Sequence, residues 1–463
     1  MALPWWTRYP GRLRAELRAL RAASFRYQVD RETFRKGRLA LTVRLHYEGV
    51  EYCLLADYPD NYPYFEPTVC APDLQFRFHL NPFHKNLCLL GRKTENWWTQ
   101  WTLARLLQEQ FPKIVEANTK PRALTKDLEF DQGEPLSIFY ATQPHSLVLV
   151  DPNWQIPPNF EGGLLRIGLK YVSSARIFAA VLEVSTWQNQ TICSLSEAMA
   201  RKFETQFWGR WIRVPEFICE DEPSKFDQIV CEKNPQIARP RWGYQKTEPF
   251  LDVIGVLFPE EIRRCELADG WIFLRRDGKA PSKRKAMPKP ERVGCSLVRA
   301  QRCADSELQS RTPESVFSRT KKVAVIGLGC IGAPLALELA KLSMPLLLVD
   351  RDEVEFGPSV RWPLGFSYLG WAKSEALRHF IGKQWPYCTV QPYARKFGED
   401  STNDEQIVQE ADVIVDATAE LGIQRYLGDM AAGLGKPVIM ISTTLGGWGG
   451  RLASFLPDRK TSL

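Results

Sequence analysis

Apolar residues along the chain recur with two different spacings. Val323–Ile326 and Leu346–Val349 are short runs that are apolar at every position, as is typical of strands buried on both faces of a parallel sheet. Between them, Leu335, Leu339 and Leu342 recur at helical spacing, so we expect a helix that buries a leucine face. The order predicts a strand, a helix and a second strand of an α/β domain.

A glycine-rich turn follows the first of these strands. Gly327, Gly329 and Gly332 form the pattern G-x-G-x-x-G, which lets the backbone turn tightly and approach a phosphate. Asp350 ends the second strand, where a carboxylate can bond a ribose hydroxyl. With a strand before it and a helix after it, this turn predicts a nucleotide site that faces phosphate with the helix N-terminus.

The residues after the second strand bear on which nucleotide is bound. Asp352 follows Asp350, and the cations Arg361 and Lys373 come next. Two cations after the ribose carboxylates suit a triphosphate more than a dinucleotide. An NAD-dependent oxidoreductase is the less favoured alternative, because it would need a hydride-accepting site that nothing in the sequence suggests.

The first 120 residues combine a helical stripe with alternating strands. A short helix is expected where apolar residues recur at Leu13, Leu17 and Leu20. The expected strands are residues 39–47, 51–57 and 68–71, with a helix from about residue 102. The first two strands flank Glu48-Gly49 and should form a hairpin, so residues 1–120 are predicted to be an α+β module.

An irregular segment lies before the last helix of this module. It contains His79, Asn81 and Cys88, and three tryptophans follow. An accessible thiol can accept and release an acyl group, and an amide side chain can stabilise the oxyanion of that attack. Cys88 is therefore a candidate acyl carrier with Asn81 as oxyanion donor, although Asn86 is closer in sequence. A buried hydrophobic cysteine is the alternative for Cys88, and a structural role is expected for His79.

Residues 121–275 predict a middle α+β module without assignable chemistry. The expected strands are residues 136–141, 146–150, 164–172 and 177–184, and a helix with a serine cap is expected over residues 194–207. The module is either a separate domain or a bridge between the two candidate catalytic units.

Length and composition place the chain among multidomain proteins. Its 463 residues, 44% hydrophobic and 25% charged, suffice for about three domains. No apolar run approaches membrane-spanning length, which excludes a membrane partner. Eleven cysteines without C-x-x-C pairs favour reduced thiols in a cytoplasm over a structural zinc site.

The net charge of +7 raises the question of nucleic-acid binding. Residues 275–292 hold eight Lys or Arg against two acids, a difference of +6. We interpret residues 276–318 as a solvated basic linker rather than a nucleic-acid tail. The last domain is then expected at residues 319–463.

The glycine loop and the charged residues after it resemble the ThiF-type adenylyltransferases, the nucleotide-binding half of ubiquitin-activating enzymes. The similarity includes GLGCIG, DRD, Arg361, Lys373 and the later ADVIVDAT and GGWGGRL. It implies a Rossmann-like fold that binds ATP with magnesium. The residues implied to hold ATP are Gly327, Gly329, Gly332, Asp350, Asp352, Arg361, Lys373 and Asp416, with Arg361 and Lys373 on the phosphates.

The N-terminal module resembles the ubiquitin-conjugating enzymes over about residues 10–118. The shared order is helix, meander, Y-P-x-x-Y-P turn, H-x-N, cysteine, tryptophan and helix. In that family a His-Pro-Asn precedes the catalytic cysteine, which implies roles for His79 and Asn81 beside Cys88. Leu80 replaces the proline, and the spacing to the cysteine is about one residue short.

The last domain departs from the adenylyltransferase pattern in three places. Residues 357–360, GPSV, replace an asparagine-containing run. Ala419 replaces the usual magnesium-binding aspartate, so the metal ligand is unknown; Asp416 is either recruited or bonded to backbone amides. The sequence ends at Leu463, before the segment that carries the activating cysteine in the family, so the domain is expected to be truncated or to lack that cysteine.

Together these features predict a fused activating and conjugating enzyme, similar to those of bacterial anti-phage operons of the cGAS-like (CBASS) type. The resemblance implies adenylation of the C-terminus of a ubiquitin-like protein or of a cGAS-like nucleotidyltransferase, then thioester transfer to a target lysine. It also implies a homodimer through the adenylation domain. An inactive module that presents a ubiquitin-like partner is the alternative.

Overall fold

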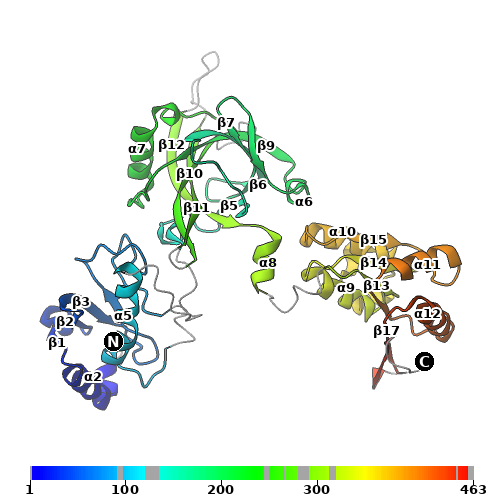
Figure 1. The fold of residues 1–463 in the computed structure, drawn as a ribbon, viewed down its shortest axis with the longest axis horizontal. Helices are drawn as coiled ribbons and strands as arrows, with labels where there is room; N and C mark the ends of the chain where they lie inside the picture. The colour runs from blue at the N-terminus through cyan, green and yellow to red at the C-terminus, as the bar shows by residue number, and fades with distance from the viewer. Residues whose placement is uncertain are drawn as a thin grey trace. The chain divides into compact units, whose positions relative to one another are not determined.

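The computed structural model describes residues 3–90, 97–119, 135–243, 250–263, 266–279, 291–311, 320–444 and 447–456. The chain forms two compact units. Unit 1 contains residues Met1–Leu149, Trp154–Ser194 and Thr205–Gln301, and unit 2 contains Val150–Asn153, Leu195–Glu204 and Arg302–Leu463. Figure 1 shows the chain with many of the helices and strands labelled.

The N-terminal part of unit 1 is an antiparallel meander with helices. Its elements are α1 (Trp5–Arg8), α2 (Pro10–Ala22), β1 (Arg26–Val29), α3 (Arg31–Arg35), β2 (Leu39–Tyr47), β3 (Val50–Tyr58), β4 (Thr68–Cys70) and α5 (Leu103–Thr119). The strands pair in the order β1-β2-β3-β4. The alternating pattern works as expected: Val43 and Leu54 pair and lie in one core cluster with Leu20 of α2 and Phe111 of α5. The predicted hairpin and the α+β character are confirmed.

The middle part of unit 1 is an eight-stranded sheet. Its strands are β5 (Leu147–Val150), β6 (Gly162–Val172), β7 (Ile177–Thr186), β8 (Thr191–Ser194), β9 (Thr205–Arg213), β10 (Phe250–Arg263), β11 (Glu266–Lys279) and β12 (Glu291–Arg302). The order is β5-β12-β11-β10-β9-β6-β7-β8, and β5 also pairs with β7. That extra pairing joins seven of the strands into a closed ring. Helix α7 (Pro223–Lys233) packs on the sheet through Phe226 and Val230, which share a core cluster with Ile254 of β10.

Two element predictions in this region were wrong. Residues 136–141 contain the 3-10 helix η2 (Leu136–Phe139) rather than a strand. The predicted helix over residues 194–207 is helical only in α6 (Glu197–Ala200), and β9 begins at Thr205. Strand β9 carries Phe207, Trp208 and Trp211 and pairs with both β6 and β10. These aromatic residues and the pairing on both sides favour a strand here, in spite of the serine that suggested the start of a helix.

The predicted basic linker was also wrong at residues 276–279 and 291–302, which lie in strands. Arg275 and Arg276 lie in β11 with fully buried side chains, and β12 continues the sheet to Arg302. The Arg276 guanidinium lies 2.6 Å from an Asp227 oxygen and 3.1 Å from an Asp252 oxygen. Charge density in the sequence suggested solvent exposure, whereas here buried carboxylates neutralise the arginines. The remainder of the basic run, residues 280–290, lies outside the described residues, as do residues 312–319.

The main part of unit 2 is a six-stranded sheet with helices on both faces. Its elements are α8 (Asp305–Arg311), β13 (Val323–Ile326), α9 (Gly332–Lys341), β14 (Leu346–Val349), η5 (Gly357–Val360), η6 (Gly365–Tyr368), α10 (Lys373–Gln384), β15 (Val390–Tyr393), α11 (Ser401–Glu410), β16 (Val413–Asp416), α12 (Leu421–Leu434), β17 (Val438–Thr443) and β18 (Gly450–Phe455). The order is β15-β14-β13-β16-β17-β18, parallel except for β18. This confirms the expected Rossmann-like α/β fold (Figure 1).

The all-apolar strands of unit 2 face two separate cores. Val323 and Val325 of β13 cluster with residues of α9 and α10, whereas Ala324 and Ile326 cluster with residues of α11 and α12. Successive residues of a strand point to opposite faces, so a strand covered on both faces must be apolar throughout. The same pattern in β14 explains why both strands could be predicted from short runs.

Helix α9 buries a different stripe from the one expected. Its buried side chains are Ala333, Ala336 and Ala340, while the predicted leucines are only partly buried at the edge of the core. Small residues let the helix approach the strands closely, and the leucines cover the margins. In the described part of the chain, no helix is long and apolar enough to cross a membrane.

Candidate nucleotide site and cysteine loop

The three glycines after β13 meet three different steric situations. Gly327 has a φ of +84°, and a Cβ there would lie 2.8 Å from the Thr418 amide nitrogen. A Cβ on Gly332 would lie 1.9 Å from the Gly327 carbonyl oxygen. A Cβ on Gly329 would meet no atom of the described residues within 4 Å, so the fold does not require a glycine there. Open space beside Gly329 is what a closely approaching ligand needs.

Asp350 braces this loop from the end of β14. Its Oδ2 accepts a hydrogen bond from the Leu328 amide at 2.6 Å, and its Oδ1 accepts one from the Asp352 amide at 2.7 Å. Burial raises the pKa of Asp350, and the two amide donors oppose this shift. Each carboxylate oxygen can accept a second hydrogen bond, so the predicted contact with a ribose hydroxyl stays open.

Two cavities lie at the carboxyl ends of the parallel strands. The first, here called the Asp350 cavity, has a volume of about 150 Å³. It is lined by Ile326, Gly327, Gly329, Val349, Asp350, Arg351, Asp352, Lys373, Arg395, Lys396, Phe397, Ala417, Thr418, Glu420 and Ile423. The second, here called the Arg361 cavity, has a volume of about 340 Å³. It is lined by Gly329, Cys330, Ile331, Pro358, Arg361, Trp362, Lys373, Ala417, Thr418, Ala419, Ser442 and Thr443.

The two cavities share part of their lining. Gly329, Lys373, Ala417 and Thr418 line both. The structure therefore brings the predicted loop glycine, the predicted carboxylates Asp350 and Asp352 and the predicted cations together at one end of the sheet. This is the edge at which open parallel sheets bind ligands.

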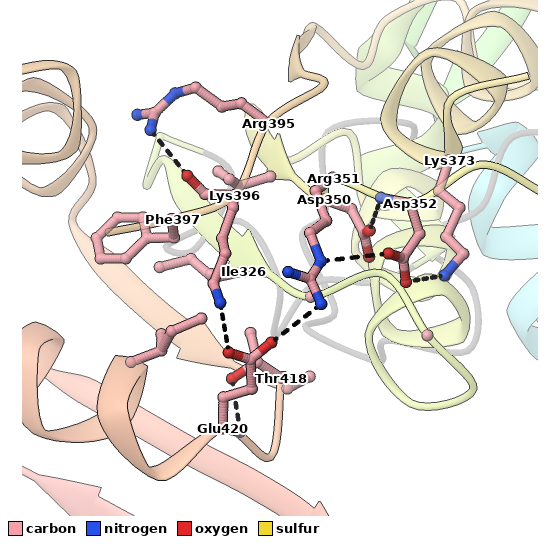
Figure 2. Close-up of a pocket in the computed structure, with 15 residues that line it drawn as sticks. Ile326, Asp350, Arg351, Asp352, Lys373, Arg395, Lys396, Phe397, Thr418 and Glu420 are labelled. Carbon is pink, nitrogen blue, oxygen red and sulfur yellow. Dashed lines mark hydrogen bonds and ion pairs between the residues drawn. The ribbon is translucent and has the colours of Figure 1, made fainter. Parts of the chain in front are cut away.

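Charged side chains form an alternating chain along the Asp350 cavity (Figure 2). Lys373 lies 2.9 Å from Asp352, and Asp352 lies 3.5 Å from Arg351. Arg351 lies 3.8 Å from Glu420, which lies 2.9 Å from Lys396. The hydrogen bond from Lys373 lowers the pKa of Asp352. Asp352 and Glu420, the two cavity carboxylates that lie beyond the ends of the strands, are therefore each paired with two cations.

The Arg361 cavity is positively charged. Arg361 is exposed, and within the described ranges no carboxylate lies within ion-pair distance of it. Trp362 beside it donates its indole N–H to the Leu328 carbonyl at 2.9 Å. Trp362 therefore holds the segment around Arg361 against the glycine loop. The exposed guanidinium of Arg361 is available to bind an anion.

Asp416 lies next to the cavities but lines neither of them. Its buried Oδ1 accepts hydrogen bonds from the Thr418 amide at 2.9 Å and the Thr418 hydroxyl at 2.7 Å. Burial raises the pKa of Asp416. The side chain thus supports the Thr418 loop, as in the alternative of a carboxylate bonded to the backbone, and its expected place among the ATP-binding residues stays a prediction.

The described residues do not form a magnesium site made of protein ligands alone. No group of three or more His, Cys, Asp or Glu among them could hold a metal ion. Ala419, at the position of the usual aspartate, lines the Arg361 cavity without a ligand atom. Magnesium is normally held by one or two carboxylates with phosphates and water.

Sequence reasoning missed several side chains that line the Asp350 cavity. Among them are Arg351, Arg395, Lys396, Phe397 and Glu420. Three of them follow β15 and one follows β16, at the carboxyl ends of parallel strands where ligands bind. The three residues after β15 could have been predicted from their position at the end of a strand. The short VQPY segment that forms β15 has no clear strand pattern, however, so the strand itself was not recognised.

The predicted residues of the N-terminal module come together in one loop. The Cys88 amide donates to the His79 carbonyl at 2.9 Å, and Leu80 bridges to Leu87. His79 is buried with a φ of +58°, in keeping with a structural role. Cys88 is half-buried, and its Sγ lies 3.7 Å from the Leu90 carbonyl oxygen.

Asn81 holds the turn of this loop. Its side-chain Oδ1 accepts hydrogen bonds from the backbone amides of Phe83 and His84, both at 2.9 Å. Its backbone N–H donates to the Asn86 carbonyl at 2.9 Å. The side-chain oxygen is therefore used by the backbone, while the side-chain NH₂ group is the part that could donate to an oxyanion.

Comparisons with known proteins identify the last domain. Residues 316–463 match the ThiF family. The chain is 28% identical to the uncharacterized protein y4oA of Sinorhizobium fredii over 98% of this chain and 80% of that protein. It is 27% identical to the ATP-dependent ubiquitin transferase-like protein Cap2 of Enterobacter hormaechei over 28% of this chain and 22% of that protein. It is 32% identical to the adenylyltransferase and sulfurtransferase UBA4 of Kluyveromyces lactis over 27% of this chain and 28% of that protein. The expected ThiF-family adenylyltransferase domain is therefore supported, and the conjugating-enzyme resemblance of residues 10–118 stays a prediction.

Proposed function

We propose that unit 2 uses ATP to adenylate a protein carboxylate. The observation that carries this proposal is the pair of adjoining cavities, one with the glycine loop and Asp350 and the other with Arg361. The similarity to UBA4, whose name describes an adenylyltransferase, supports the same reaction.

In this proposal the nucleoside occupies the Asp350 cavity. Asp350 is positioned to bond the ribose, and Phe397 and Ile423 offer apolar surface to the base. The phosphates lie beside Gly329 and Lys373, because both residues line both cavities. A carboxylate oxygen of the substrate attacks the α-phosphorus, the bond to the β-phosphate breaks, and pyrophosphate leaves with the electron pair.

Arg361 has a role in this step that follows from its position. It lines the cavity next to the shared phosphate wall and has no carboxylate partner among the described residues. A guanidinium placed there stabilises negative charge that develops on the phosphates in the transition state. Arg361 is thus the proposed catalytic cation, and Lys373 is released from Asp352 to meet the phosphates.

We extend the proposal to acyl transfer by Cys88. The acyl group would pass from AMP to the Cys88 thiol as a thioester and then to a lysine of a target protein. The loop that joins His79, Asn81 and Cys88, the α+β meander around it and the similarity to Cap2, named as ubiquitin transferase-like, support this step. The implied substrate is the C-terminus of a ubiquitin-like protein or of a cGAS-like nucleotidyltransferase, in a bacterial defence setting.

Mass spectrometry of adducts formed by the full chain with ATP and candidate partners tests this proposal. We expect a thiol-labile adduct on Cys88 in the wild type and none at this position in Cys88→Ala. Cys53→Ala is the matched control, because Cys53 is a half-buried cysteine of β3. An equal adduct in Cys88→Ala would rule out Cys88 as the acyl carrier.

A further inference from the structure

We propose that the Arg361 cavity binds the polyphosphate of a nucleotide as the free anion, without a divalent cation held by the protein. The inference rests on the proposed nucleotide site and specifies its metal requirement. Arg361 and Lys373 then supply the positive charge that a bound cation would otherwise supply.

The lining of the Arg361 cavity is the first argument. Among its described lining residues are two cations and no carboxylate. Hard cations such as Mg²⁺ need oxygen ligands and prefer carboxylates. The hydroxyl groups of Thr418, Ser442 and Thr443 are weaker ligands, so this cavity favours an anion over a cation.

The neighbouring carboxylates are the second argument. Asp352 lies 2.9 Å from Lys373, and Glu420 lies 2.9 Å from Lys396. A metal ion at Glu420 would have to displace the Lys396 ammonium, and a metal ion at Asp352 would have to compete with Arg351 even after Lys373 has turned to the phosphates. Arg351 also reaches both of them, at 3.5 Å and 3.8 Å.

The backbone at position 419 is the third argument. Ala419 has a φ of +59°, a left-handed conformation that Asp adopts more readily than Ala. The geometry therefore does not exclude an aspartate here. Since Ala419 lines the cavity, an aspartate at this position would place a carboxylate where the metal ligand is missing.

Charge balance predicts how magnesium should affect binding. Free ATP carries two more negative charges than its magnesium complex. A cavity with unpaired cationic charge attracts the more negative species more strongly. Added magnesium should thus leave the affinity of the wild-type chain unchanged or lower it.

The test is calorimetric titration of the full chain with the α,β-methylene analogue of ATP, once in EDTA and once in excess Mg²⁺. We expect the Kd of the wild-type chain in EDTA to be equal to or lower than its Kd in Mg²⁺, which means that binding without magnesium is at least as tight. Ala419→Asp should reverse the order and bind about tenfold or more tightly in Mg²⁺ than in EDTA, as expected for a gained metal ligand. Ala432→Asp is the control, because it adds the same charge at an exposed position of α12.

The outcomes separate this inference from the proposed function. Wild-type binding that is tenfold or more weaker in EDTA overturns the inference and leaves the nucleotide site in place. Absence of binding under both conditions overturns the nucleotide site as well. Equal affinities of Ala419→Asp in the two conditions contradict position 419 as the place of the missing ligand. The wild-type comparison decides even if that variant does not fold.

Discussion

The glycines of the loop after β13 differ in whether the fold itself requires them. Gly332 is enclosed, since a Cβ there would lie 1.9 Å from the Gly327 carbonyl oxygen, whereas Gly329 borders open space in both cavities. The two positions therefore separate folding from ligand binding within one motif.

We predict opposite effects for two substitutions in this loop. Gly332→Ala should destabilise unit 2 by about 1–3 kcal/mol, because backbone must move to make room for the methyl group. Gly329→Ala should leave the melting temperature nearly unchanged and weaken ATP binding, because its methyl group enters the shared cavity wall. Thermal denaturation and calorimetric titration of both variants measure this. A stable Gly332→Ala that binds ATP normally would contradict the steric account.

Thiol chemistry at the residue scale follows from burial. Burial raises the pKa of Cys303 and of Cys388 to about 12, whereas Cys330 is exposed at the Arg361 cavity. The thiolate is the reactive form, and its fraction falls tenfold for each pH unit below the pKa.

We therefore predict selective alkylation at pH 8. Iodoacetamide should modify Cys330 quickly and leave Cys303 and Cys388 intact in the folded chain, and ATP should protect Cys330. Peptide mass spectrometry over time gives the rates. Modification of Cys388 as fast as Cys330, or no effect of ATP on Cys330, would contradict the placement of these thiols.

The elements that the sequence predicted best are those in which pattern and burial coincide. β13 and β14 are apolar throughout because two cores enclose them, and the β2–β3 hairpin alternates because one face is buried. β9 was missed because its pairing with β6 and β10 depends on residues far away in sequence. Likewise, the sequence could not reveal that Asp227 and Asp252 lie beside Arg276. For the site, the loop and the cations were predicted, but the side chains after β15 depended on a strand without a clear pattern.

A buried arginine in β11 gives a prediction at the scale of an element. Arg276→Ala should destabilise the eight-stranded sheet by up to about 3–5 kcal/mol, because Asp227 and Asp252 lose the fully buried guanidinium that they share and keep one arginine each, Arg292 and Arg210. Arg201→Ala should change stability by less than about 0.5 kcal/mol, because the exposed Arg201 pairs, among the described residues, only with Glu197. Hydrogen exchange of the β10 and β11 amides reports the difference. Equal exchange in the two variants would restore the interpretation of this segment as a linker.

At the scale of the whole molecule, the proposal divides the chemistry between two units. In this proposal adenylation is assigned to unit 2, which holds both cavities, and acyl transfer is assigned to Cys88 in unit 1. The two steps should therefore be separable by mutation.

We predict that Cys88→Ala keeps partner-dependent adenylation and loses transfer to lysine. Asn81→Ala should still charge Cys88 but discharge it more slowly, by about a hundredfold if its NH₂ group is an oxyanion donor. Because Asn81 also holds the loop through Phe83 and His84, its charging rate serves as the internal control. Slow charging together with slow discharge would mean that Asn81 acts only through the loop.

The central claim is carboxylate adenylation at the paired cavities, and exchange of labelled pyrophosphate into ATP tests it most directly. With a ubiquitin-like partner ending in a free carboxylate, the wild-type chain should catalyse exchange that depends on that partner. Arg361→Ala should lower exchange by about a hundredfold and weaken ATP binding by a smaller factor, because the arginine binds the phosphates and interacts more strongly with the charge that develops on them in the transition state. Arg378→Ala, at an exposed arginine of α10 paired with Glu375, should match the wild type. Exchange by Arg361→Ala at the wild-type rate, or no exchange with a partner that becomes linked to the chain in the presence of ATP, would contradict the account.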